Sequence, residues 1–243
     1  MFLTKNINDT KTRSGLTCIM NSKNIRCWIR TYTQLLAFDF NRLLYAHRSN
    51  YNIYLSSIGA HTNQDNGLLI IHYNAEKILS QLPADVNIAF MRPVGFYKNL
   101  LGYINGIKAQ DVIASNYGED DTVLLVSATD IAAVIVEELV SKVPGRKVRY
   151  VASEELTCNQ VAGILGGAID KPDLKWIIIT DEQLLNGLKA FGMNTSFAES
   201  FVVMNASTHN GMIYEDYYRK KPILGKEKLT AFAKEFAAVY HQQ

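Results

Sequence analysis

Asn52-Ile-Tyr-Leu-Ser-Ser-Ile-Gly-Ala-His61 is the stretch that decides the fold, together with the segment 67–79 that follows it. The first begins with the β-prone run 53–55 and ends in two serines, whereas the second has apolar residues at helical spacing. A strand, a loop and a helix in this order form the repeating unit of a parallel sheet. Ligands of open α/β sheets bind at the carboxyl ends of the strands, where Ser56 and Ser57 stand. The stretch therefore predicts an α/β fold with a ligand site beside these hydroxyls.

The rest of the chain continues the alternation of strands and helices. Capping boxes at Thr157 and Thr180 mark two helix starts, and Thr129 is expected to cap a third helix that Asp130 opens. The last helix carries Phe232 and Phe236 on one face. We expect strands at 87–91, 122–126, 147–151 and 174–179. Two helices are expected to start near 96 and 130, and four more to span 158–168, 181–190, 197–207 and 229–240.

Composition bounds the class of protein. With 243 residues, 48% of them hydrophobic, the chain can bury the core of one large domain or two small ones. A net charge of +2 argues against bulk attraction to nucleic acid or to a membrane surface. No apolar run reaches the roughly 18 residues of a membrane span, and no secretory signal is present. The cysteines, Cys18, Cys27 and Cys158, have no disulfide or metal spacing, so we expect free thiols and a soluble cytoplasmic protein.

The first fifty residues differ from the rest. They carry eight Lys and Arg against Asp9 and Asp39, and only the segment 32–45 has a pattern that would suit a helix. Gly15 is the only glycine before Gly59. A dinucleotide-binding turn needs closely spaced glycines, because the backbone must approach the pyrophosphate. No such turn can therefore precede the first clear strand.

Five ordered segments, 54–61, 72–76, 92–99, 127–133 and 232–238, resemble the NmrA-like family of atypical short-chain dehydrogenase/reductase proteins, including its NAD(P)H:quinone-oxidoreductase-type members. The resemblance covers most of the chain from residue 51 onward. It implies a Rossmann-type parallel sheet flanked by helices, with a smaller and mostly helical carboxyl-terminal lobe over the cleft. It also implies NADP or NAD as cofactor and a small carbonyl or quinone as substrate.

The resemblance also implies that the amino-terminal half of the nucleotide domain differs. Family members begin with glycine-rich strand–helix units, which need roughly 60–100 residues before the serine strand, and only about 50 precede Asn52 here. We therefore expect three parts: 1–50, unlike the family; 51–150, the remaining half of the nucleotide domain; and 151–243, the substrate or interaction lobe. A natural replacement, a misplaced start and a frameshift all fit this difference. We expect weak dinucleotide binding, and self-association through the sheet edge if the segment 1–50 does not cover it.

His72 and Glu76 are the predicted catalytic pair. They stand where ordinary short-chain dehydrogenases carry their Tyr and Lys, and a separation of four residues places them on one helical face. Glu76 is expected to raise the pKa of His72, so that the pair can relay a proton near neutral pH. The alternative is a polar pair that only orders the cleft. Zinc is not expected, because no third ligand lies nearby in sequence.

The resemblance places Ser56, Ser57, Phe96, Tyr97 and Asn99 near the nicotinamide and the substrate. The alternatives are strand-end hydroxyls that bond to the following loop and, for Phe96, core packing. For Asp130, a structural role at the helix start is favoured over a role in the site. Met and aromatic side chains suit flat apolar ligands such as quinones, and those that could line the lobe are Met193, Phe197, Met204 and Tyr214. Core packing is the favoured alternative for these four residues.

Three functions remain open. The first is an NAD(P)H-dependent oxidoreductase that acts on a small carbonyl or quinone, with the proton handled by His72 and Glu76. The second is a nucleotide-sensing or protein-binding regulator without turnover, which the absent Tyr and Lys favour. The third is a remnant without activity. No nucleic-acid or membrane partner is expected.

Overall fold

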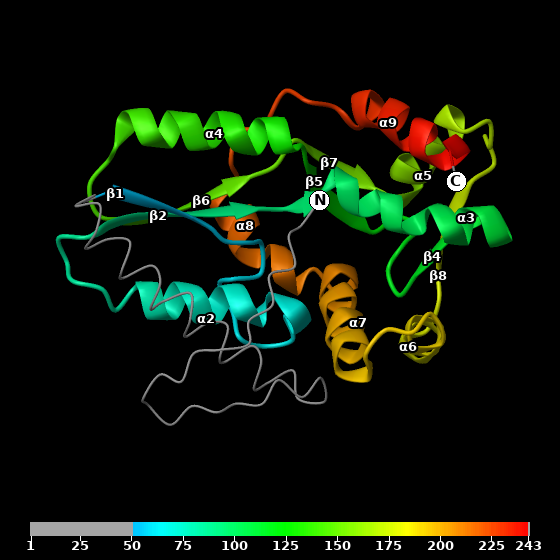
Figure 1. The fold of residues 1–243 in the computed structure, drawn as a ribbon, viewed down its shortest axis with the longest axis horizontal. Coiled ribbons are helices and arrows are strands. Elements are labelled where there is room, and N and C mark those ends of the chain that lie inside the picture. The colour runs from blue at the N-terminus through cyan, green and yellow to red at the C-terminus, as the bar shows by residue number, and fades with distance from the viewer. Residues whose placement is uncertain (1–50, 243) are drawn as a thin grey trace, which may run out of the picture.

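The computed structural model describes residues 51–242, which form an α/β fold (Figure 1). Its parallel sheet holds β1 (Tyr51–Leu55), β2 (Asn87–Pro93) and β6 (Arg146–Val151) in the order β1-β2-β6. In Figure 1, α4 (Ala128–Ser141) runs along one face of this sheet and α2 (Ile70–Leu79) along the other. The predicted fold class, a partial Rossmann-type sheet flanked by helices, is confirmed. The predicted helix at 32–45 lies outside the described residues.

Strand pairing in the rest of the fold joins distant segments. In one sheet β3 (Gly95–Phe96) pairs in parallel with β5 (Thr122–Val126), which pairs antiparallel with β7 (Glu154–Thr157). In the other, β4 (Val112–Ser115) and β8 (Lys175–Ile178) form a parallel pair. Both sheets therefore take strands from either side of residue 150. The division of the chain at that residue stays a prediction.

The carboxyl-terminal lobe is mostly helical, as expected. Both capping boxes are present, with Thr157 and Gln160 at one helix start and Thr180 and Gln183 at the other. Short 3-10 turns lead into several helices. The remaining helical elements are η1 (Gly67–Leu69), η2 (Tyr97–Tyr103), α3 (Ile104–Gln110), α5 (Cys158–Ala168), α6 (Asp181–Ala190), α7 (Thr195–His209), η3 (Met212–Tyr214), α8 (Glu215–Lys220) and α9 (Leu229–Gln242).

The start of α4 corrects one prediction. Ser127, and not Thr129, caps the helix, because its hydroxyl accepts a hydrogen bond from the backbone N–H of Asp130 at 2.9 Å. The Asp130 carboxylate lies in the first turn but also holds a distant segment. It accepts hydrogen bonds from the backbone N–H groups of Lys226 and Glu227, both at 3.1 Å, and from the Ser153 hydroxyl. Asp130 is therefore structural, as expected, and it ties α4 to the chain just before α9.

The hydrophobic core falls into two large clusters. One gathers around α5, α9 and β8, with Leu165, Trp176 and Phe236 fully buried. The other lies between the parallel sheet and α8, with Met91 and Tyr217 fully buried. Residues of both clusters border a cavity at the junction of the sheet and the lobe. The fold therefore places a hollow where the carboxyl ends of the strands meet the lobe.

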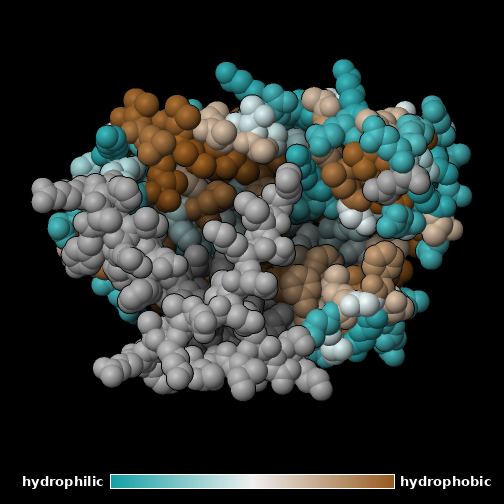
Figure 2. Space-filling view, in the orientation of Figure 1, coloured by the Kyte–Doolittle hydropathy of each residue, from teal (hydrophilic) through white to brown (hydrophobic). Residues whose placement is uncertain are grey.

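Figure 2 shows an apolar patch over α4. The exposed hydrophobic residues of this helix include Val136, Leu139 and Val140. No helix within residues 51–242 has the length and apolar character needed to cross a membrane. Self-association through the edge of the sheet stays a prediction.

Candidate functional site

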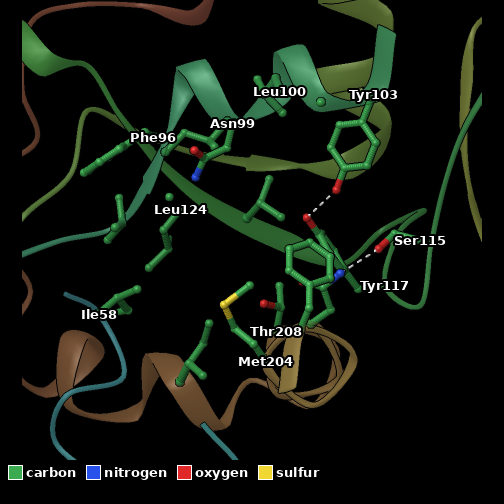
Figure 3. Close-up of a pocket in the computed structure, with 18 of the residues that line it drawn as sticks. Ile58, Phe96, Asn99, Leu100, Tyr103, Ser115, Tyr117, Leu124, Met204 and Thr208 are labelled. Atoms are coloured by element: carbon green, nitrogen blue, oxygen red, sulfur yellow. Dashed lines mark hydrogen bonds between the residues drawn. The ribbon is translucent and has the colours of Figure 1, made fainter. Parts of the chain in front are cut away.

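The candidate site is a cavity of about 870 Å³ (Figure 3). Its walls come from the carboxyl ends of β1 and β2, from η2 and α3, from β4 and β5, and from α6 and α7. This volume lies in the usual range for small-molecule pockets, about 300–1,000 Å³. Leu124, Ile58 and Met204 make part of an apolar wall, and the hydroxyls of Tyr103 and Tyr117 face one another across from it. The cavity therefore suits a mainly apolar ligand that carries a few polar atoms.

Five of the predicted site residues line this cavity, although they come from three separate segments. Ser56 and Ser57 follow β1, His72 comes from α2, and Phe96 and Asn99 come from the consecutive elements β3 and η2. The parallel pairing of β1 with β2 brings these segments together, because it aligns their carboxyl ends. The cavity thus lies where the sequence placed the ligand site.

Tyr97 lies elsewhere. Its ring is buried and stacks on Phe232 with 5.7 Å between the ring centroids. Its hydroxyl donates to a carboxylate oxygen of Glu154 at 2.8 Å and lies 3.2 Å from the carbonyl oxygen of Glu227. Burial and the neighbouring Glu154 raise the pKa of Tyr97. Tyr97 therefore joins η2 to β7 and to the segment before α9, and it does not line the cavity.

Glu76 also lies behind the cavity wall, where it is paired with Arg92. Nε and Nη2 of Arg92 donate to the two carboxylate oxygens of Glu76 at 2.9 and 2.6 Å. The Ser56 hydroxyl donates to the same carboxylate, and Nη1 of Arg92 reaches Tyr150 and Asp216. A bidentate pair of this kind fixes geometry. Because the Ser56 hydroxyl donates its proton to Glu76, only its oxygen lone pairs remain to accept a hydrogen bond from a ligand.

His72 departs from the expected electrostatics. Burial lowers its pKa, and this effect outweighs the opposing influence of Glu76, which raises it. The expectation that Glu76 would set a raised pKa is therefore wrong, since desolvation disfavours the imidazolium more than the carboxylate stabilises it. Nδ1 of His72 is buried and has no hydrogen-bond partner. A neutral imidazole with an unused nitrogen thus borders the cavity.

The substrate-lobe predictions are met in part. Met193, Met204 and Tyr214 line the cavity, whereas Phe197 does not and is 40% exposed. Sequence reasoning missed a further group, for which no pattern pointed to the site because β4 was not predicted. These residues are Tyr103, Ser115, Tyr117, Trp176 and Asn205.

The cavity fits one part of a dinucleotide and not the other. A flat nicotinamide ring could lie against the apolar wall, with Ser57, His72 and Asn99 to bind its amide. A pyrophosphate needs a tight glycine turn at a helix start, and no Gly-x-Gly occurs anywhere in this sequence. Among the residues that the structure describes, no three His, Cys, Asp or Glu side chains are grouped to hold a metal ion.

No protein-family model matches this sequence, and no curated protein matches it. Solved structures do resemble it. Triphenylmethane reductase from a Citrobacter species is 17% identical with a TM-score of 0.65, covering 85% of this chain and 72% of that one. An NADPH-dependent quinone oxidoreductase from Escherichia coli, complexed with NADPH, is 18% identical with a TM-score of 0.63, covering 80% and 68%.

A nucleoside-diphosphate-sugar epimerase from Staphylococcus aureus is 12% identical with a TM-score of 0.59, covering 88% of this chain and 81% of that one. At these identities the likeness establishes the fold alone. The described residues therefore adopt the α/β fold of epimerases and NAD(P)H-dependent reductases.

Proposed function

We propose that this protein binds a flat, apolar carbonyl compound of the quinone class in the cavity between its sheet and its lobe. The observation that carries the proposal is the cavity itself, about 870 Å³, at the carboxyl ends of β1 and β2. Its walls are mainly aliphatic and aromatic, so a ring system gains from leaving water. Ser57, His72 and Asn99 provide polar contacts at the sheet end. The NmrA-like motifs support the same ligand class.

Binding without efficient turnover is the form that the residues favour. The resemblance puts Glu76 at the position of the lysine of ordinary short-chain dehydrogenases, and Arg92 and Ser56 hold its carboxylate. The resemblance puts His72 at the position of the tyrosine, and burial lowers its pKa. No glycine turn is present to hold a pyrophosphate. The protein is therefore proposed to bind a small molecule without efficient turnover, on a fold like that of oxidoreductases, and to have weak affinity for NADPH.

Isothermal titration calorimetry with menadione tests the proposal. We expect saturable binding to the full chain, and a loss of affinity of at least tenfold in Met204→Trp, which fills the cavity. Val203→Trp is the matched control, because the neighbouring Val203 is 39% exposed and does not line the cavity. Equal affinities in the two variants, or no binding by the wild type, would refute the proposal.

The two predicted residues Asn99 and Tyr97 give a second comparison. Asn99→Ala is expected to weaken menadione binding about three- to tenfold, the effect of one lost hydrogen bond. Tyr97→Phe should leave the affinity unchanged, because the Tyr97 hydroxyl binds Glu154 and not the cavity. The reverse ranking would show that the turn after β2 moves when the ligand binds.

An NAD(P)H-dependent oxidoreductase is the second candidate. The observation that favours it is the position of Ser57 after β1 and of His72 in α2, both beside space for a flat ring. Oxidation of NADPH, followed at its absorbance band with a panel of small quinones, distinguishes the two candidates. Turnover that is lost in His72→Ala and kept in Tyr73→Phe would favour the enzyme, whereas menadione binding without NADPH oxidation would favour the receptor.

A further inference from the structure

The far end of the cavity carries two hydrogen-bonded pairs of polar groups. Nδ2 of Asn205 donates to the hydroxyl of Ser115 at 3.1 Å, and both residues are at least nine-tenths buried. The hydroxyls of Tyr103 and Tyr117 lie 3.0 Å apart (Figure 3). Four polar residues from η2, β4, the turn after β4, and α7 therefore line the same end of the cavity.

One hydroxyl proton of the two tyrosines is not used in a hydrogen bond between them. An amide nitrogen can only donate, so Ser115 accepts from Asn205. Tyr103 and Tyr117 have two hydroxyl protons between them, and the hydrogen bond that joins them uses only one. Whichever tyrosine donates to the other, one phenolic O–H has no acceptor among residues 51–242.

The buried position of the two tyrosine hydroxyls increases the gain from a hydrogen bond to a ligand. Burial raises the pKa of Tyr103 to about 12, opposed by its hydrogen bonds to Tyr117 and Ser115, and burial raises the pKa of Tyr117 well above 10. Both hydroxyls therefore keep their protons at physiological pH. An O–H donor in an apolar hollow gains substantially from a ligand oxygen, because its other surroundings do not satisfy it.

Packing holds the pair in place. Trp176 contacts both tyrosine rings, with centroids 5.0 Å from Tyr103 and 5.3 Å from Tyr117, and its Nε1 donates to the Tyr117 carbonyl at 2.9 Å. Gly118 follows, and a side chain at that position would collide with the indole ring. The hydroxyls are thus fixed before any ligand arrives, which lowers the entropic cost of binding.

We propose that the Tyr103–Tyr117 pair is a hydrogen-bond-donating subsite that binds a carbonyl or hydroxyl oxygen of the ligand at the lobe end of the cavity. The subsite lies apart from Ser57 and His72, which border the sheet end. The inference rests on the proposed function and makes it more specific. The ligand is a ring compound that carries an acceptor oxygen in addition to its apolar surface, and a plain aromatic hydrocarbon lacks the group that this subsite binds.

Calorimetry with two probes tests the subsite: menadione, which carries ring oxygens, and 2-methylnaphthalene, which has a similar ring system without them. The wild type is expected to bind menadione more tightly. In Tyr103→Phe/Tyr117→Phe, affinity for menadione should fall about tenfold, the effect of one buried hydrogen bond. Affinity for 2-methylnaphthalene should not change. Tyr218→Phe is the control, because Tyr218 is 45% exposed and outside the cavity.

The outcomes separate the two proposals. A double variant that keeps the wild-type ratio of the two affinities overturns the subsite and leaves the proposed function intact. A wild type that binds neither probe overturns the proposed function. If the double variant does not fold, the wild type decides: a wild type that binds 2-methylnaphthalene as tightly as menadione refutes the subsite.

Discussion

Arg92 holds Glu76 through two hydrogen bonds, from Nε at 2.9 Å and from Nη2 at 2.6 Å, with both side chains nearly inaccessible to solvent. This pair connects the end of β2 with the middle of α2. It also orients Ser56, whose hydroxyl donates to Glu76. Glu76 thus ties α2 to β2 behind the cavity wall, and its catalytic role stays a prediction.

Removing the carboxylate tests that role. Glu76→Ala leaves the Arg92 charge with Asp216 as its remaining acidic partner among residues 51–242, and we expect a loss of about 3 kcal/mol of unfolding free energy, as for a broken buried ion pair. Urea denaturation at neutral pH measures it. Glu235→Ala is the control, because the Lys98–Glu235 pair is exposed and should contribute less than about 1 kcal/mol. Similar small losses in both variants would contradict the assignment.

Stability should depend on pH through His61 and His72. Burial lowers the pKa of both below the ordinary value of 6.5. The unfolded chain therefore binds more protons than the folded chain as the pH falls below about 6.5, and folding free energy is lost in that range. Thermal unfolding between pH 7 and pH 5 should show this loss. His61→Gln/His72→Gln should flatten the dependence, and a double variant with the full wild-type slope would disprove it.

Asp130 should protect the segment before α9 from proteolysis. Its pKa is lowered because hydrogen bonds from Ser153, Lys226 and Glu227 outweigh the raising effect of burial. Asp130→Ala removes the acceptor for two backbone N–H groups, at a cost of about 1–3 kcal/mol. We expect faster tryptic cleavage after Lys226, followed by mass spectrometry. The exposed Asp120→Ala should be cut at the wild-type rate, and equal rates in all three proteins would show that Asp130 does not hold this segment.

Local patterns in the sequence were sufficient for most of the elements. Both capping boxes and the helices that they start were confirmed at the predicted residues, because a cap and its helix lie within one turn of each other. β5 was predicted at its observed bounds, since an apolar run flanked by polar residues is a local signal. β4 was missed. Its four residues form a strand only because β8, some sixty residues later, pairs with it.

The site divides in the same way. By itself the sequence determined the α/β fold and pointed to the end of the sheet where the cavity lies, because strand–loop–helix order puts Ser56 and Ser57 at the carboxyl end of a strand. Only the tertiary structure decided which side chains face that site. It turned Tyr97 into the core, paired Glu76 with Arg92, and brought Tyr103 and Tyr117 together at the other end of the cavity. The physical reason is that burial and pairing depend on neighbours from distant segments, which no local pattern records.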